Sequence, residues 1–153
     1  MSILVMPRWL AMFIGLTFAF ATEVAQAREA TPDVPSTGED ERAVQAVVGA
    51  QLKAFRDGDL AMAFSFADQT IQAMVGGPRQ FGVMVARGYG PIYANESHRF
   101  LQVQVQGIQA AQVVLVRGRD GTIALAQYQL SKASGQWRIR GVSMQLMPPA
   151  TEL

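Results

Sequence analysis

The first residues to weigh for chemistry are a lone histidine and two carboxylates. His98 is the only histidine in the chain, and imidazole exchanges protons most readily near neutral pH. With Glu96 and Asp68, it would form an acid-base group of the kind that general catalysis uses. The alternative is that His98, which follows the polar residues Asn95-Glu96-Ser97, begins a strand in contact with solvent. The second interpretation is favoured, so we predict no catalytic residue.

Two more carboxylates, Asp57 and Asp59, have a local structural explanation. They flank Gly58 between two apolar segments, and Asp is a common turn and helix-capping residue. We therefore interpret Asp57 and Asp59 as turn and cap residues and not as a catalytic pair. The sequence also contains neither a Gly-rich phosphate loop nor a Gly-x-Ser-x-Gly nucleophile elbow.

The composition argues against metal, thiol and nucleic-acid chemistry. The chain has no cysteine, which excludes disulfides, thiolate metal sites and cysteine nucleophiles. One histidine without others at ligand spacing disfavours a zinc site, and we expect neither a metal nor a cofactor. The 13 Lys and Arg residues balance 12 Asp and Glu residues, so no excess positive charge attracts nucleic acid.

Aromatic side chains are the best candidates for contact with a ligand. Small-molecule sites combine apolar and aromatic walls with a few polar groups, and tyrosine supplies both. The candidate ligand-binding residues are Tyr89, Tyr93, Tyr128, Phe64 and Trp137. The alternative for Tyr89 and Tyr128 is a place in the core with a satisfied hydroxyl, as is usual for buried tyrosines.

Helical periodicity occupies the part of the chain that follows residue 40. Val44, Val47, Val48, Leu52 and Phe55 recur at helical spacing, which predicts a helix with one buried stripe. The 13 or so residues before it are rich in Pro, Thr, Ser, Gly and acidic residues and are expected to form a flexible leader. Three helices are predicted in all, over 44–55, 60–67 and 78–88.

From residue 98 onward, the period of the apolar residues changes to two, which predicts strands. In the first strand, Leu101, Val103 and Val105 are expected to face the core while the glutamines between them face outward. The turn Gly118-Arg119-Asp120-Gly121 predicts a hairpin between the next two strands. Those strands are expected over 112–117 and 122–131.

The last strand changes phase along its length. Trp137 and Ile139 share one parity, whereas Val142 and Met144 have the other, and Gly141 lies at the change. A β-bulge at Gly141 accounts for this pattern, and bulges curve a sheet. Three helices followed by four such strands predict an α+β fold, with the helices packed on one face of a curved antiparallel four-stranded sheet.

Glutamines give the predicted sheet an uncharged polar surface. Such a face repels another sheet poorly and so suits a homodimer; a plainly solvated face explains the pattern equally well. These glutamines are Gln102, Gln104, Gln106, Gln127 and Gln129.

The first 27 residues have the features of a secretory signal peptide. A short basic region ends at Arg8, an apolar stretch covers 10–21, and Ala25-Gln26-Ala27 offers small residues for a signal peptidase. We predict cleavage after Ala27 and a periplasmic or secreted protein that meets the membrane only during export. The alternative is an uncleaved anchor, but Pro7 and Arg8 interrupt the apolar stretch. The domain is then expected over 41–147, between the leader 28–40 and the tail 148–153.

Five local strings between residues 41 and 147 carry a resemblance to a known family. They are Ala54-Phe55-Arg56-Asp57-Gly58-Asp59, Ala63-Phe64-Ser65-Phe66-Ala67, Phe81 with Met84-Val85, Gly88-Tyr89-Gly90-Pro91-Ile92-Tyr93, and Trp137-Arg138-Ile139-Arg140-Gly141. These strings resemble those of the bacterial domain of unknown function 4864 family, and the resemblance covers roughly residues 41–147. That family is similar to the nuclear-transport-factor-2-like, or cystatin-like, superfamily, so the resemblance implies a curved sheet wrapped around helices to form a cone. Members often carry Cys after the terminal Gly, where this chain has Val142.

Three functions remain open because a fold of this kind hosts both enzymes and binders. The favoured one is a noncatalytic small-ligand-binding or scaffold module of the bacterial envelope, with a small apolar ligand inside the cone. The second is an interaction protein whose sheet face meets a partner or a second copy. The third is an enzyme similar to cone-fold isomerases or hydratases, which requires an acid-base residue in the pocket.

Overall fold

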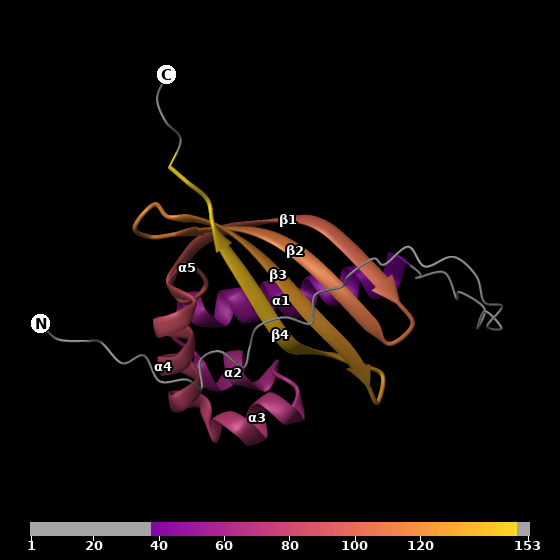
Figure 1. Cartoon of the computed structure of the whole chain (residues 1–153). Coiled ribbons are helices and arrows are strands. Elements are labelled where there is room, and N and C mark those ends of the chain that lie inside the picture. The colour runs from indigo at the N-terminus through magenta and orange to yellow at the C-terminus, as the bar shows by residue number, and fades with distance from the viewer. Residues whose placement is uncertain (1–37, 150–153) are drawn as a thin grey trace, which may run out of the picture. The chain divides into compact units, whose positions relative to one another are not determined.

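A four-stranded antiparallel sheet forms one layer of the structure, and helices pack against one of its faces (Figure 1). The computed structural model describes residues 38–149. The predicted signal peptide, the leader up to residue 37 and residues 150–153 of the tail lie outside the described residues. The helices are α1 (Gly38–Asp57), α2 (Leu60–Ser65), α3 (Gln69–Val75), α4 (Pro78–Gly88) and α5 (Gly90–Tyr93), and the strands are β1 (Asn95–Gln106), β2 (Gln109–Gly118), β3 (Ile123–Ala133) and β4 (Gln136–Leu146).

The described residues contain five helices, not the three that the sequence predicts. The additional helix α3 is capped by Asp68, whose carboxylate accepts a hydrogen bond from the backbone N–H of Ile71 at 2.9 Å. It was missed because Ile71 is its only buried residue, so no apolar stripe marks it. The other, α5, is a single turn of four residues. Within residues 38–149, no helix has both the length and the apolar character needed to cross a membrane.

The predicted stripe of α1 is confirmed. Val44, Val48, Leu52 and Phe55 are buried, and Val47 is partly buried against the same core. The helix begins at Gly38, so three residues assigned to the leader belong to it. At the other end, Gly58 has a positive φ of 72°, a conformation that glycine adopts without steric cost. Asp59 then caps α2 by accepting from the backbone N–H of Met62 at 2.9 Å. The turn and cap that the Asp-Gly-Asp string predicts are therefore present.

Strand β1 contains a bulge that the sequence did not reveal. Phe100 pairs with Val114 but Val103 pairs with Gln112, so the two residues between them on β1 oppose a single residue of β2, Val113. The extra residue reverses the side-chain parity. Phe100 therefore shares the helix-facing side of the sheet with Val103, and Leu101, expected in the core, is 45% exposed.

The bulge predicted in β4 is confirmed one residue from its expected place. Gln129 pairs with Gly141 while Leu130 pairs with Ile139, which leaves Arg140 as the extra residue. Trp137 and Ile139 are buried before the bulge. Beyond it, Val142 and Met144 pack against the same core. The helix-facing side thus stays apolar along the whole strand.

Candidate functional site

Two buried polar atoms without a partner belong to residues that are paired on the helix-facing side of the sheet. Gln112 of β2 and Tyr128 of β3 are directly opposite each other in the strand register, and both residues are 0% exposed. Within residues 38–149, neither Gln112 Oε1 nor the Tyr128 hydroxyl has a hydrogen-bond partner. Such groups are uncommon in native proteins because their desolvation is costly. The Gln112–Tyr128 pair is therefore the strongest candidate for a ligand contact.

The Gln112 side chain is oriented by the bulge in β1. Its Nε2 donates to the backbone oxygen of Gln102, at 3.1 Å, and to that of Val113, at 2.8 Å. Gln102 lies within the stretch where the β1–β2 register shifts, so the glutamine amide supplies a donor that the ladder does not. Because both amide protons are used, the group that Gln112 offers to the interior is the acceptor Oε1.

The Tyr128 hydroxyl is available as a donor. Burial raises the pKa of Tyr128 above its ordinary value, so the phenol remains protonated across the physiological pH range. Apart from Gln112 on β2, its neighbours in the sheet are apolar: Val142 lies opposite on β4, and Ala126 and Leu130 of β3, on the same face, are buried. A polar hydrogen is thus presented inside an apolar surrounding.

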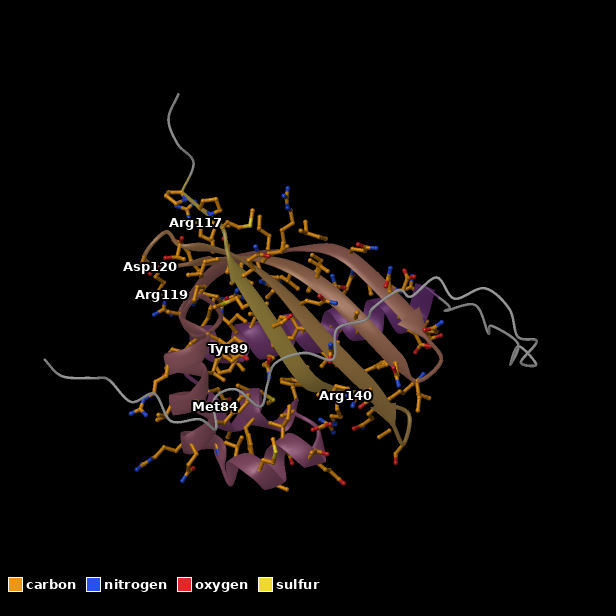
Figure 2. All side chains as sticks on the ribbon, viewed as in Figure 1. Met84, Tyr89, Arg117, Arg119, Asp120 and Arg140 are labelled. Carbon is orange, nitrogen blue, oxygen red and sulfur yellow. The ribbon has the colours of Figure 1, made fainter. Side chains whose placement is uncertain are left out.

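Tyr89 connects the helices to the same part of the sheet. Its hydroxyl donates to the backbone oxygen of Val142 at 3.1 Å, and Val142 is the residue paired with Tyr128. Tyr89 lies between α4 and α5 and is partly buried (Figure 2). The sequence predicted Tyr89 and Tyr128 as ligand contacts, and the fold brings both to Val142.

Tyr93 and Phe64 belong instead to an aromatic cluster in the helical layer. Phe55 of α1 packs against Tyr93 of α5, with ring centroids 5.8 Å apart, and against Phe81 of α4, at 5.9 Å. Phe64 of α2 adds a further contact with Phe81 at 5.4 Å. The cluster ties four helices together, which gives Tyr93 and Phe64 a structural reason for their positions.

Trp137 lies away from the pair and holds the start of α1. Its indole N–H donates to Asp40 Oδ1 at 3.1 Å, and the ammonium of Lys132 lies 2.7 Å from the same oxygen. Lys132 also lies over the indole ring, 5.6 Å from its centroid. Trp137 pairs with Lys132, which lies four residues along β3 from Tyr128.

The three residues of the hypothetical acid-base group are separate. His98 lies against α1. Its Nε2 is 3.9 Å from the position that a Cβ on Gly49 would occupy, and its Nδ1 is 3.4 Å from Arg56 Nη1. Burial and the nearby Arg56 charge lower the pKa of His98. Glu96 is exposed and faces Arg117 at 3.5 Å, and Asp68 caps α3. Among the described residues, no three His, Asp or Glu side chains gather as metal ligands would.

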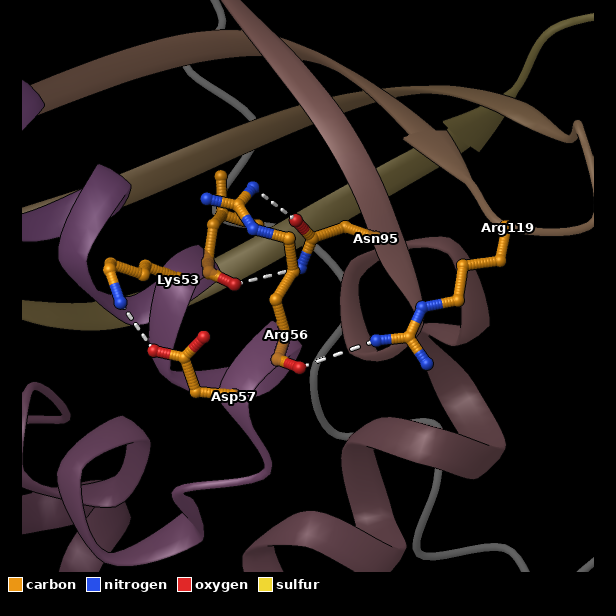
Figure 3. Close-up of polar contacts among 6 residues, drawn as sticks. Lys53, Arg56, Asp57, Asn95 and Arg119 are labelled. Carbon is orange, nitrogen blue, oxygen red and sulfur yellow. Dashed lines mark hydrogen bonds and ion pairs between the residues drawn. The ribbon is translucent and has the colours of Figure 1, made fainter.

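A buried asparagine that sequence reasoning missed joins α1, α5 and β1 beside His98. Asn95 is 0% exposed, and its Nδ2 donates to the backbone oxygens of Leu52, at 2.9 Å, and Ile92, at 2.8 Å. Its Oδ1 accepts from Arg56 at 2.9 Å, and Arg119 donates to the Arg56 backbone oxygen at 3.3 Å (Figure 3). All polar atoms of the amide have hydrogen-bond partners, so Asn95 has a structural role.

Gln112 was also missed, although its position carried a signal. It shares strand parity with Val114 and Val116, the residues that a half-buried strand turns toward its core. A polar side chain at such a position must find partners or remain unsatisfied. The pairing with Tyr128 was beyond sequence reasoning because it depends on the register between two strands.

Solved bacterial structures share this fold. No curated protein matches the chain in sequence. An NTF2-like protein of unknown function from Methylobacillus flagellatus superposes with a TM-score of 0.59 at 14% identity, covering 76% of this chain and 98% of that one. A domain of unknown function with a cystatin-like fold from Nostoc punctiforme gives a TM-score of 0.56 at 14% identity, with coverages of 75% and 82%. An NTF2-like protein of unknown function from Silicibacter pomeroyi gives a TM-score of 0.54 at 18% identity, covering 74% of this chain and 100% of that one.

At such low sequence identity, these structural matches establish a shared fold and say nothing of activity. They confirm the expected nuclear-transport-factor-2-like, or cystatin-like, fold of the described residues. The family described as domain of unknown function 4864 matches residues 37–151, and the chain belongs to that family.

Proposed function

We propose that this protein is an exported, noncatalytic module of the bacterial envelope that holds a small, mainly apolar ligand between its helices and its sheet. The observation that carries the proposal is the Tyr128 hydroxyl, which is fully buried and has no partner within residues 38–149. A folded protein tolerates such a group where a ligand completes its hydrogen bonding. The cone-like enclosure implied by the family resemblance is part of the same proposal.

A binding role agrees better with the site than a catalytic one. Acid-base catalysis needs a titratable group within reach of the substrate. His98, Glu96 and Asp68 each have a different local contact. The buried pair is Gln112 and Tyr128; the amide does not titrate, and the phenol has its pKa raised by burial. These groups are suited to hold a molecule in place.

Native mass spectrometry of the protein purified from its own cell envelope tests the binding role. We expect a retained small molecule that is lost on denaturation and is taken up again when the refolded protein meets an organic extract of the same cells. The refolded protein before addition of the extract is the control for nonspecific adducts. A protein that leaves the envelope without a ligand, and takes up none from the extract, would contradict the proposal.

Export has its own test at the predicted cleavage site. We expect the mature protein in the periplasmic fraction to begin at Arg28, because Ala25-Gln26-Ala27 offers the small residues that signal peptidase requires. The variant Ala27→Leu is the control, since a bulky residue at the site should block cleavage and leave the longer chain in the membrane fraction. A wild-type chain that keeps residues 1–27 would support the anchor instead.

The alternative function is self-association through the outer face of the sheet. Within the described part of the chain, no helix covers this face (Figure 1), and beside its glutamines it carries apolar residues that are only partly buried. Leu115 and Leu125 are paired across β2 and β3. The others are Val113 and Ile123. Apolar patches left open on a sheet are common sites of association.

Light scattering on the mature protein distinguishes the two functions. Self-association predicts twice the chain mass for the wild type and a single mass for Leu115→Arg, whose charge would be buried in the interface. Met62→Arg, on the exposed side of α2, is the matched control and should leave the mass unchanged. A monomeric wild type would remove the alternative and leave the binding function standing.

A further inference from the structure

We propose that the Gln112–Tyr128 pair recognises a neutral molecule that carries a hydroxyl group on an otherwise apolar body, and this inference rests on the binding function proposed above. The two residues lie directly opposite each other on adjacent antiparallel strands. Side chains in such positions share one face of the sheet, with Cβ atoms about 5 Å apart. The two unpartnered groups therefore belong to the same face of the sheet.

The hydrogen-bonding capacity of the pair defines the ligand group. Tyr128 offers an O–H donor, and Gln112 offers only the acceptor Oε1 because its Nε2 is already bonded to two backbone oxygens. A ligand hydroxyl accepts from Tyr128 and donates to Gln112 through one oxygen. A ketone or ether oxygen accepts from Tyr128 but leaves Gln112 Oε1 unsatisfied. A hydrocarbon leaves both groups unsatisfied.

A charged ligand is disfavoured by the surroundings of the pair. The buried polar residues in the described part of the chain are Gln51, Asn95 and Gln112, and none of these carries a charge. A carboxylate would meet no cation and would turn a second acceptor toward Gln112. An ammonium group would be desolvated without a counter-charge, which is more costly than the burial of a neutral group.

The body of the ligand is expected to be apolar because the residues around the pair are. Val114 and Leu130 follow Gln112 and Tyr128 on the same face and are fully buried, and Val142 lies opposite Tyr128. Apolar groups in this surrounding gain by leaving water. One polar contact with apolar surroundings specifies an alcohol and excludes a sugar-like molecule, which would bring several hydroxyl groups without partners.

Five probes with the same six-membered ring test the inference: cyclohexanol, cyclohexanone, methylcyclohexane, cyclohexanecarboxylate and cyclohexylamine. Binding to the refolded, ligand-free protein is measured by calorimetry and by the NMR shift of the Gln112 side-chain amide. We expect cyclohexanol to bind about tenfold more tightly than cyclohexanone, which corresponds to one hydrogen bond of about 1.4 kcal/mol, and cyclohexanone in turn to bind more tightly than methylcyclohexane, which satisfies neither group. The two charged probes should bind more weakly than either.

The variant Tyr128→Phe assigns the preference to the pair. It should lower the affinity for cyclohexanol about tenfold while the affinity for methylcyclohexane stays the same or rises, since the change removes only a hydroxyl. Tyr93→Phe is the matched control because Tyr93 packs in the aromatic cluster of the helical layer. Its affinities should equal those of the wild type.

The possible failures are distinguishable. If no probe binds and no molecule is retained from the envelope, the binding function itself is wrong. If methylcyclohexane or cyclohexanecarboxylate binds as tightly as cyclohexanol, the protein binds ligands but the inferred hydroxyl recognition is wrong. A crystal structure in which a water molecule bridges Gln112 and Tyr128, and remains in the presence of cyclohexanol, would also overturn it.

Discussion

The carboxylate of Asp40, in the first turn of α1, accepts a hydrogen bond at 3.1 Å from the indole of Trp137, near the start of β4. The two residues are 97 positions apart in the chain. The contact therefore fixes the start of α1 on β4, an edge strand of the sheet. Lys132 adds an ion pair to the same oxygen at 2.7 Å. Helix α1 thereby acquires a defined position over the sheet face that carries Gln112 and Tyr128.

The Asp40 contact predicts a loss of stability in acid. Hydrogen bonds from Lys132 and Trp137 lower the pKa of Asp40 from 3.8. Because the folded-state pKa lies below the unfolded one, the contribution of this carboxylate is complete above pH 4 and is lost as the pH falls through the folded-state value. The melting temperature of Asp40→Asn should therefore be below that of the wild type at pH 7, with a difference that shrinks below pH 4. Glu39→Gln, in the same helical turn, is the control and should show a smaller difference at pH 7.

Two tyrosines provide a paired test of which hydroxyl is satisfied in the free protein. Tyr89 donates to the backbone oxygen of Val142, so Tyr89→Phe should lower the free energy of unfolding by about 1 kcal/mol. Tyr128 has no partner in the described part of the chain, so Tyr128→Phe should leave that free energy unchanged or raise it by up to about 1 kcal/mol. Urea denaturation of the ligand-free proteins measures both. A Tyr128→Phe variant that is less stable than Tyr89→Phe would mean that Tyr128 has a partner.

The parts of the fold that could be predicted from the sequence are those whose apolar pattern lies within a single helix or strand. The stripe of α1 follows from the helical spacing of Val44, Val48, Leu52 and Phe55. The bulge in β4 follows from a change of parity that is visible in the strand itself, around Gly141. In both cases, the apolar pattern is local and the core side is unambiguous.

The features of the sheet that were missed depend on pairing between segments. The string that begins at Leu101 alternates without interruption, so only the register with β2 reveals the bulge that exposes Leu101. The same holds for the candidate site. Tyr128 is recognisable as a candidate in the sequence, but its opposite residue Gln112 is known only once the strands are aligned. A one-residue slip would have turned either side chain to the other face.

Asn95 should prove essential to folding stability. Its amide bonds two backbone oxygens and Arg56 while fully buried, and buried partners that lose their hydrogen bonds are costly. We expect Asn95→Ala to lower the free energy of unfolding by about 3 kcal/mol, within the range for a broken buried network. Ser97→Ala, two residues further along β1 and exposed, should change it by less than about 0.5 kcal/mol. Equal effects in urea denaturation would show that the Asn95 contacts contribute little.

We expect neutral His98 to stabilise the folded protein and its protonation to destabilise it. Burial and the Arg56 guanidinium lower its pKa from 6.5, and its Nδ1, 3.4 Å from Arg56 Nη1, is an acceptor only while the ring is neutral. Since the folded-state pKa lies below the unfolded one, stability is complete above pH 6.5 and declines as the pH falls toward and through the folded-state value.

NMR titration measures this pKa directly, because the chain has one histidine and the imidazole signals need no assignment. Arg56→Gln removes the neighbouring charge and should raise the pKa toward 6.5, although not fully, because burial remains. Arg87→Gln, in the last turn of α4, is a charge-matched control and should leave the titration unchanged. A wild-type pKa at or above 6.5 would place His98 in solvent or beside an acid, and the acid-base hypothesis would then return.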